Sequence, residues 1–232
     1  DGMEMDLQQS RYLDFKALSL YCYRVASVVG LLARVTPTVK IAGSCNAVRR
    51  AADGSLEGDM FDGEGFVRGL KRKGFVPEGK RALVVGSGGV GSAIAASLAQ
   101  AGVAELTLFD VNTASCEGLA SRLREHYPAL QVRTGSHDPA GQDLAVNATP
   151  MGMNPGDPLP MDTSRLAPGT FVGEVVMRAE KTAFLAAAEA RGCPVQIGTD
   201  MLFEQIPAYL EFFGYPTTTA DTLRSLATLK YA

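Results

Sequence analysis

A glycine-rich turn between an apolar run and a helix-forming segment is the feature that most constrains how this chain folds. The turn at 86–91 fits the pattern GxGxxG, with an apolar run at 81–85 before it and a small-residue segment at 92–100 after it. The first glycine allows a tight turn, the second lets the backbone approach a pyrophosphate, and the third lets the helix pack against the strand. The turn therefore predicts a dinucleotide-binding βαβ unit.

Strand-like and helix-like segments alternate after this turn. We expect an α/β protein with a Rossmann-type parallel sheet, a smaller N-terminal α/β substrate domain, and C-terminal helices that pack back toward it. The expected domains are 1–75, 76–200 and 201–232. The expected strands after the turn are 106–110, 130–133, 143–147, 170–176 and 194–197, and the helices are 113–126, 181–191 and most of 201–231. Before residue 78 we expect helices at 27–34 and 63–71 and a short strand at 46–48, with the Pro37 region ending the first helix.

Composition excludes several function classes. The formal net charge of -3 offers no general attraction to nucleic acid or to an anionic membrane. No apolar run approaches the roughly 20 residues of a membrane span, and the first ten residues lack the pattern of a signal peptide. The four cysteines form no CxxC pair, so no metal site is expected. We expect a cytoplasmic protein with a small-molecule substrate, and a homodimer is the oligomer considered.

Asp110, which ends the second predicted strand of the βαβ unit, bears on the choice of cofactor. A carboxylate there accepts hydrogen bonds from the adenosine ribose hydroxyls and repels a 2′-phosphate, and the next residues, 111–113, contain no arginine to hold that phosphate. NAD is therefore favoured over NADP. The alternatives are a strand-end aspartate that caps a helix, and an S-adenosylmethionine site. The predicted contacts from this part of the chain are Gly86, Ser87, Gly88, Gly89, Val90, Gly91 and Asp110.

A second polar cluster, Asn147-Ala-Thr-Pro-Met-Gly-Met, begins at the last residue of the predicted strand 143–147. Ligands of open α/β folds bind at the carboxyl edge of the sheet, where this cluster would lie. Asn147 and Thr149 could bind ribose or nicotinamide, and Met151 could pack against the ring. The alternative is an ordinary turn.

At this point the sequence resembles the shikimate dehydrogenase family. Four segments carry the resemblance in family order: Gly43-Ser-Cys-Asn-Ala-Val, Gly58-Asp-Met-Phe-Asp-Gly-Glu-Gly-Phe, the Asn147 cluster, and Gly198-Thr-Asp-Met-Leu-Phe-Glu-Gln. The resemblance spans roughly 41–213. It implies a two-domain NAD(P)-dependent oxidoreductase that exchanges hydride with a secondary hydroxyl of a cyclic polyol carboxylate such as shikimate or quinate.

The resemblance also implies site residues. Asn46, Asp62 and Gln205 would bind substrate hydroxyls, with Asp62 also part of the proton-transfer pair. Val175, Gly198 and Met201 would lie at the nicotinamide end. Without the family, Asp62 and Asn46 would each be interpreted as turn residues.

The N-terminal part departs from the family pattern. The family's proton-transfer lysine, in a Pro-x-Lys segment, has no match here, and Arg24 is the nearest basic residue in its place. Arginine holds its proton too tightly for efficient acid–base work near neutrality. The paired serines that hold the substrate carboxylate are also unmatched, and Met177 and Met60-Phe61 replace polar family residues.

Two further hypotheses follow from these departures. One is a catalytically silent protein that senses the cofactor or a quinate-like ligand on the same fold. The other is an incomplete N-terminal domain, because only 45 residues precede Asn46. The true substrate, in either case, need not be shikimate.

Overall fold

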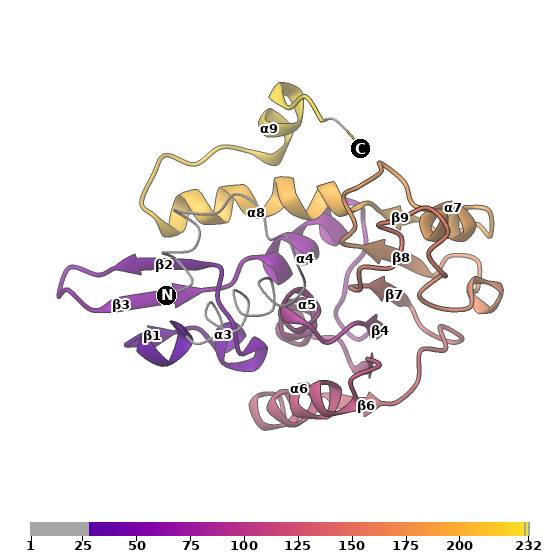
Figure 1. The fold of residues 1–232 in the computed structure, drawn as a ribbon, viewed down its shortest axis with the longest axis horizontal. Coiled ribbons are helices and arrows are strands. Elements are labelled where there is room, and N and C mark those ends of the chain that lie inside the picture. Colours follow the sequence, from indigo (N-terminus) through magenta and orange to yellow (C-terminus); the bar gives the residue numbers. More distant parts are fainter. Residues whose placement is uncertain (1–27, 230, 232) are drawn as a thin grey trace.

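The structure, a computed structural model, describes residues 28–229 and 231 and contains two β-sheets. A small sheet and a large sheet lie at opposite sides of the molecule, with helices α4 and α8 between them (Figure 1). In the part of the chain that the structure describes, no helix is long and apolar enough to cross a membrane.

The large sheet is entirely parallel, with the strand order β6-β5-β4-β7-β8-β9. Its strands are β4 (Arg81–Val85), β5 (Glu105–Phe109), β6 (Gln131–Thr134), β7 (Leu144–Asn147), β8 (Phe171–Glu174) and β9 (Val195–Gln196). The chain leaves the central strand β4 in one direction and returns on its other side at β7. This is the order of a doubly wound dinucleotide fold, in which ligands bind outside the carboxyl ends of the strands where the order reverses.

Helices cover both faces of this sheet. The helices are α5 (Gly89–Gln100), α6 (Thr113–His126), α7 (Ala183–Glu189) and the short 3-10 helix η2 (Thr163–Arg165). One core cluster joins α4, α5 and α6 to one face, and a second joins α7 and the η2 region to the other face. Most side chains on β4 and β7 are completely buried, which explains the continuous apolar runs in their sequences.

The small sheet has the order β1-β3-β2, from β1 (Arg34–Val35), β2 (Ala47–Arg50) and β3 (Leu56–Asp59). β3 pairs parallel with β1 and antiparallel with β2. The predicted helix at 27–34 was wrong within the described residues, which form a single 3-10 turn, η1 (Val28–Leu31), and then β1.

Pro37 does not end a helix but begins one, α3 (Pro37–Ala42). The Thr36 hydroxyl accepts a hydrogen bond from the Val39 amide and caps the helix, and proline suits the first helical position because it has no amide to satisfy there. The helix ends at Gly43, whose left-handed conformation (φ 69°) reverses the chain toward β2.

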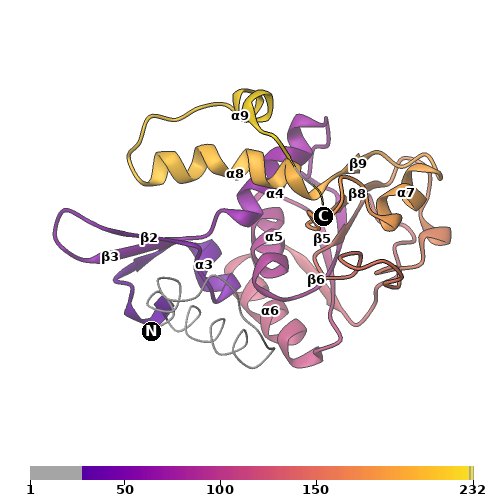
Figure 2. The same cartoon turned by 45° about the horizontal axis from the view of Figure 1, so that its top comes forward.

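Helices α4 (Asp62–Arg72) and α8 (Gly198–Phe212) join the two sheets (Figure 2). Glycines let α4 approach its neighbours closely. A methyl group on Gly63 would lie 2.1 Å from the Ala93 carbonyl oxygen of α5, and one on Gly65 would lie 2.7 Å from the Gln205 Cβ of α8. The last helix, α9 (Ala220–Leu226), returns over α8, where Arg224 bonds to Asp200 and Glu204.

Candidate active site

The glycine turn has the geometry of a pyrophosphate cradle. Gly86 adopts a φ of 109°, which side-chain-bearing residues rarely reach. A methyl group on Gly91 would lie 2.0 Å from the Gly86 carbonyl oxygen, so only glycine lets α5 start this close to β4. A methyl group on Gly88 would meet nothing within 4 Å, so its backbone borders open space in front of the helix. The helix N-terminus therefore presents free amides and a positive dipole end to that space.

A cavity of about 630 Å³ extends from this turn along the carboxyl edge of the sheet. Its walls come from the ends of β4 and β5, from the 148–160 segment and from His137, whose ring lies 4.5 Å from that of Phe109. Among these lining residues there is no arginine or lysine. Its size and position fit a dinucleotide that lies across the switch point of the sheet.

Asp110 lies on this cavity wall and is fixed by two backbone amides. Its Oδ2 accepts a hydrogen bond from the Ser87 amide over 2.6 Å, and its Oδ1 accepts one from the Asn112 amide over 2.8 Å. The carboxylate thus ties the glycine turn to the end of β5. Because two carboxylate oxygens offer about four lone-pair sites, Asp110 can still accept hydrogen bonds from ribose hydroxyls.

The Asn147 cluster forms a turn organised by its own side chains. Asn147 is fully buried; its Nδ2 donates to the Met151 carbonyl over 3.0 Å, and its Oδ1 accepts from the Thr149 amide and hydroxyl. Thr149 and Met151 line the same cavity as Asp110. The buried amide therefore holds the turn in one conformation at the cavity wall.

Glu174, which pairs in register with Asn147 on the next strand, is a fully buried carboxyl. The Thr182 hydroxyl donates a hydrogen bond to its Oε2 over 2.9 Å. Burial raises its pKa to about 7, although the Thr182 and Asn147 side chains oppose this shift. The sequence analysis missed this residue, because Glu174 lies outside the motifs and, unlike Asp110, is not at the spacing from the glycine turn that would give a strand-end carboxylate a meaning.

Val175, Gly198 and Met201 meet where β8 and α8 adjoin. A methyl group on Gly198 would lie 2.2 Å from the Val176 carbonyl oxygen and 2.9 Å from the Val175 carbonyl carbon, so glycine is required for α8 to begin there. Met201 is almost fully buried in the large core cluster, and Val175 packs against that cluster.

On the small-sheet side, Asn46 and Asp62 lie together. Asn46 Nδ2 donates to Asp62 Oδ1 over 2.9 Å, and Asn46 Oδ1 accepts from the Phe61 amide over 3.0 Å. Burial raises the pKa of the Asp62 carboxyl, and the Asn46 hydrogen bond opposes that shift. The neighbouring Ser44 hydroxyl lies 3.7 Å from the position of a methyl group on Gly89, so this segment borders the start of α5.

Gln205 lies on α8 where that helix packs against α4, with its Cβ 2.7 Å from the position of a methyl group on Gly65. It is almost fully buried, and its Oε1 has no hydrogen-bond partner among the described residues. One turn later, Tyr209 packs edge-to-face on Phe61, with ring centroids 5.0 Å apart. Burial, and then the charge of Asp62, raise the pKa of the Tyr209 phenol, which keeps this group a hydrogen-bond donor. Sequence reasoning missed Tyr209, although its spacing of four from Gln205 places both on one helix face.

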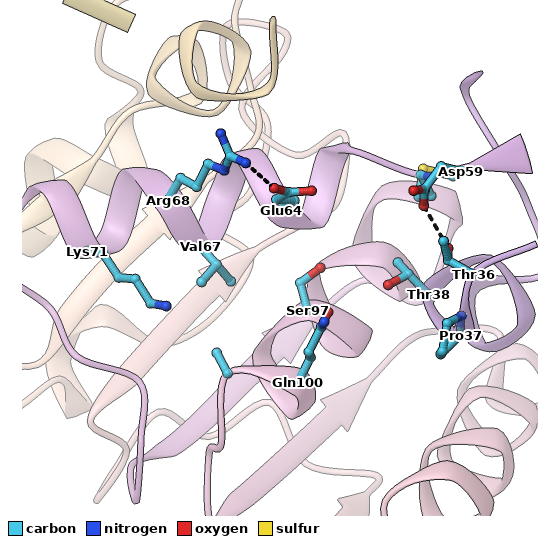
Figure 3. Close-up of a pocket in the computed structure, with 12 residues that line it drawn as sticks. Thr36, Pro37, Thr38, Asp59, Glu64, Val67, Arg68, Lys71, Ser97 and Gln100 are labelled. Carbon is cyan, nitrogen blue, oxygen red and sulfur yellow. Dashed lines mark hydrogen bonds and ion pairs between the residues drawn. The ribbon is translucent and has the colours of Figure 1, made fainter. Parts of the chain in front are cut away.

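A second cavity, of about 520 Å³, lies between α4, the end of α5 and the start of α3 (Figure 3). Arg68 and Glu64 pair on its α4 wall, and Thr36 donates to Asp59 opposite. Its lining includes none of Asn46, Asp62 and Gln205, so the substrate residues that the sequence indicates belong elsewhere. Arg24 lies outside the described residues. No metal-binding cluster is present among residues 28–229 and 231.

Two family models match parts of the chain. The ThiF family model matches residues 78–134, the part that holds the glycine turn and Asp110. The squalene/phytoene synthase model matches residues 1–48, the segment in which the family lysine was sought. Neither match reaches half of the chain.

Whole-chain relatives give a consistent result. A shikimate dehydrogenase (NADP(+)) of Rubrobacter xylanophilus is 35% identical over 209 residues, covering 88% of this chain and 74% of the relative. A quinate/shikimate dehydrogenase (NAD(+)) of Corynebacterium efficiens is 34% identical over 216 residues, covering 90% of this chain and 75% of that relative. A crystal structure of shikimate 5-dehydrogenase from Listeria monocytogenes, in complex with shikimate and NAD, matches with a TM-score of 0.80 at 27% identity, covering 87% of this chain and 73% of that one.

The doubly wound sheet, the glycine turn and the cavity beside it define a nicotinamide-dinucleotide-dependent oxidoreductase with a second, substrate-side domain. The chain belongs to the shikimate/quinate dehydrogenase family. This confirms the fold class and the family resemblance that the sequence motifs predicted.

Proposed function

We propose that this chain is an NAD-dependent dehydrogenase that oxidises a secondary hydroxyl of a shikimate- or quinate-like carboxylate, or reduces the corresponding ketone. The observation that carries the proposal is the hydrogen-bonded pair of Asn46 and Asp62 beside the start of α5. Family membership supplies the reaction type, and this pair supplies groups that can hold a reacting hydroxyl.

The preference for NAD over NADP is part of the proposal. Asp110 faces the cavity as a fixed carboxylate, and the cavity lining contains no guanidinium or ammonium group to hold a 2′-phosphate. The relatives include enzymes named for each cofactor, so the choice rests on the residues of this chain.

The proposed roles combine the family resemblance with the contacts of this structure. Asn46 orients the Asp62 carboxyl, Asp62 takes or returns the hydroxyl proton, and the buried Gln205 oxygen accepts a substrate hydroxyl. The nicotinamide ring, when bound, supplies the hydride acceptor. Asn147, Thr149, Met151, Val175, Gly198 and Met201 are assigned to its half of the cofactor. Arg24 stays a prediction as a cationic partner of this pair.

Raised basicity suits Asp62 to this role. An exposed aspartate is too weak a base to accept a proton efficiently near neutrality, and burial raises the pKa of this one above its ordinary value. The hydrogen bond from Asn46 holds Oδ1, so the carboxyl keeps one orientation while the proton moves.

Spectrophotometry tests the proposal. The protein is mixed with NAD+ and, separately, NADP+ and a panel of cyclic polyol carboxylates including shikimate and quinate, and reduced cofactor is followed by absorbance. We expect turnover with at least one substrate, and a higher kcat/KM with NAD+ than with NADP+. NADH binding without turnover on any substrate would instead favour a silent ligand-binding protein.

A further inference from the structure

Glu174 is a buried carboxyl to which the roles above give no function. It is completely shielded from solvent at the carboxyl end of β8. Thr182 donates to Oε2, while Oε1 has no partner among the described residues. Leaving a buried polar atom unpaired costs free energy, so packing alone does not account for a carboxyl at this position.

Two segments assigned to the nicotinamide half of the cofactor meet at this carboxyl. On one side, Asn147 pairs with Glu174 in register, and the Asn147 carbonyl accepts from the Val175 amide over 3.2 Å. On the other side, Thr182 lies 3.4 Å from the position that a methyl group on Gly152 would occupy, directly after Met151. Glu174 therefore lies beneath both the Asn147 turn and Val175.

We propose that Glu174 is a positioning residue that sets the Asn147–Met151 turn and Val175 in the arrangement that receives the nicotinamide half of the cofactor. The inference rests on the proposed function, because it assigns Glu174 to the binding of that cofactor. Glu174 acts through Asn147 and Thr182 and is not assigned any contact with the reacting atoms.

The protonation state of Glu174 connects it to the turn. A neutral acid leaves the Asn147 amide directed at the Met151 carbonyl, whereas a carboxylate is the stronger acceptor and draws the amide nitrogen toward Glu174. With a pKa raised to about 7 by burial, both forms are populated near neutrality. Ionisation should then loosen the turn and weaken cofactor binding.

No buried charge near Glu174 complicates this interpretation within the described residues. β7 and β9, the strands beside β8, contribute only uncharged side chains there. The charged groups from the adjoining loops, Asp157, Arg178 and Lys181, line a surface pocket with Thr182. Asp157 also lines the cofactor cavity, where its Oδ2 accepts a hydrogen bond from the Gly152 amide over 3.1 Å. The Lys181 side chain is further paired with Glu189.

Calorimetric titration of the whole protein with NADH, at a series of pH values from about pH 6 to about pH 8, tests the inference. For the wild type we expect the Kd to rise about fivefold or more between these values, as coupling free energies of this size predict. Glu174→Gln, which stays neutral, should flatten the profile. Thr182→Val removes a group that lowers the pKa of Glu174, so it should move the midpoint of the pH dependence upward.

Glu189→Gln is the matched control, because it removes an exposed carboxylate from the same region and should reproduce the wild-type profile. Should Glu174→Gln fail to fold, the midpoint shift of Thr182→Val decides. NADH binding with the same pH profile in the wild type, Glu174→Gln and Thr182→Val would overturn this inference alone. Absence of NADH binding to the wild type throughout this pH range would overturn the proposed function and this inference with it.

Discussion

Asn46 donates a hydrogen bond from its side-chain nitrogen to Asp62, and its side-chain oxygen accepts one from the Phe61 amide directly before Asp62. Both ends of one amide are thus used to hold the first residue of α4. Because Gly63, the next residue, packs against the backbone of α5, the carboxyl is fixed relative to the cofactor side of the molecule as well.

The first prediction concerns Asp62. Replacing it by asparagine removes the proton acceptor but keeps the shape and the Asn46 contact. We expect kcat to fall by about 10²–10⁴-fold, the range for a lost acid–base group, with the Kd for NADH unchanged. Steady-state kinetics and calorimetry measure the two quantities. Glu64→Gln, two residues further along α4 and paired with Arg68, is the control; near-normal kcat in Asp62→Asn would contradict the assignment.

The second prediction concerns cofactor choice. The double variant Asp110→Ser, Val111→Arg removes the carboxylate that repels a 2′-phosphate and adds a guanidinium beside it. Val111 is 86% exposed, so the longer side chain has room. We expect the ratio of kcat/KM for NADP+ over NAD+ to rise by about tenfold or more, because charge-assisted contacts to phosphate replace repulsion. An unchanged ratio would show that Asp110 serves only as a cap for the turn.

The third prediction concerns the glycine turn. Gly91→Ala places a methyl group against the Gly86 carbonyl oxygen, so α5 must shift away from β4. We expect a loss of about 1–3 kcal/mol in the free energy of unfolding, as for other overpacked sites, together with a loss of NADH affinity. Denaturant unfolding and calorimetry test both. Gly30→Ala is the control, since a methyl group there meets nothing within 4 Å; equal behaviour of the two variants would refute the close contact.

The fourth prediction is a pH dependence of stability. The folded-state pKa of Glu174 lies above its ordinary value, so the native protein binds the proton more tightly than the unfolded chain does. Its contribution to the free energy of unfolding is present below the ordinary glutamate pKa and is lost as the pH rises through about 7. The total is about 3 kcal/mol. Denaturant unfolding at several pH values measures the free energy of unfolding. Between about pH 4 and pH 7 this free energy should fall more steeply in the wild type than in Glu174→Gln, because all other titrating groups are common to the two proteins.

The nucleotide half of the fold was predictable because its signals are local. The helix at 113–126 has the bounds expected from sequence, since Asn112 caps its start and apolar residues repeat along one face. The strands β4 and β7 are buried on both faces and appear as continuous apolar runs.

The substrate half was less predictable because its structure depends on distant contacts. β3 contains Glu57, Gly58 and Asp59, which favour no strand, and it forms because it pairs with β1 and β2 on either side. Gly58 is needed there, since a methyl group would lie 2.3 Å from the Leu32 side chain. Thr36 gives the local signal that Pro37 starts a helix. The expectation that the Pro37 region ends a helix left this capping residue out of account.

The site residues likewise divide into those that a sequence motif indicates and those that only tertiary packing brings into the site. The family motifs indicated Asn46, Asp62 and Gln205 as site residues. They did not indicate that Asn46 and Asp62 form a hydrogen bond with each other. Glu174 and Tyr209 lie in the site through tertiary packing and belong to no motif used to find it. The proton-transfer lysine was sought in a segment that instead matches the squalene/phytoene synthase model, so the family pattern had little to align with there.

The glycines of α4 have a consequence for how this protein can diverge. Gly63 and Gly65 lie against the backbones of α5 and α8. A methyl group on Gly69 would lie 2.9 Å from the Gln196 side chain. A mutation at Gly63 or Gly65 pushes two structural layers apart, and one at Gly69 displaces the Gln196 side chain, whereas Phe61 and Tyr209 pack on each other through their rings. New substrate preferences should therefore arise by exchange of the aromatic residues beside Asp62, while the helix that carries Asp62 tolerates almost no variation on its inner face.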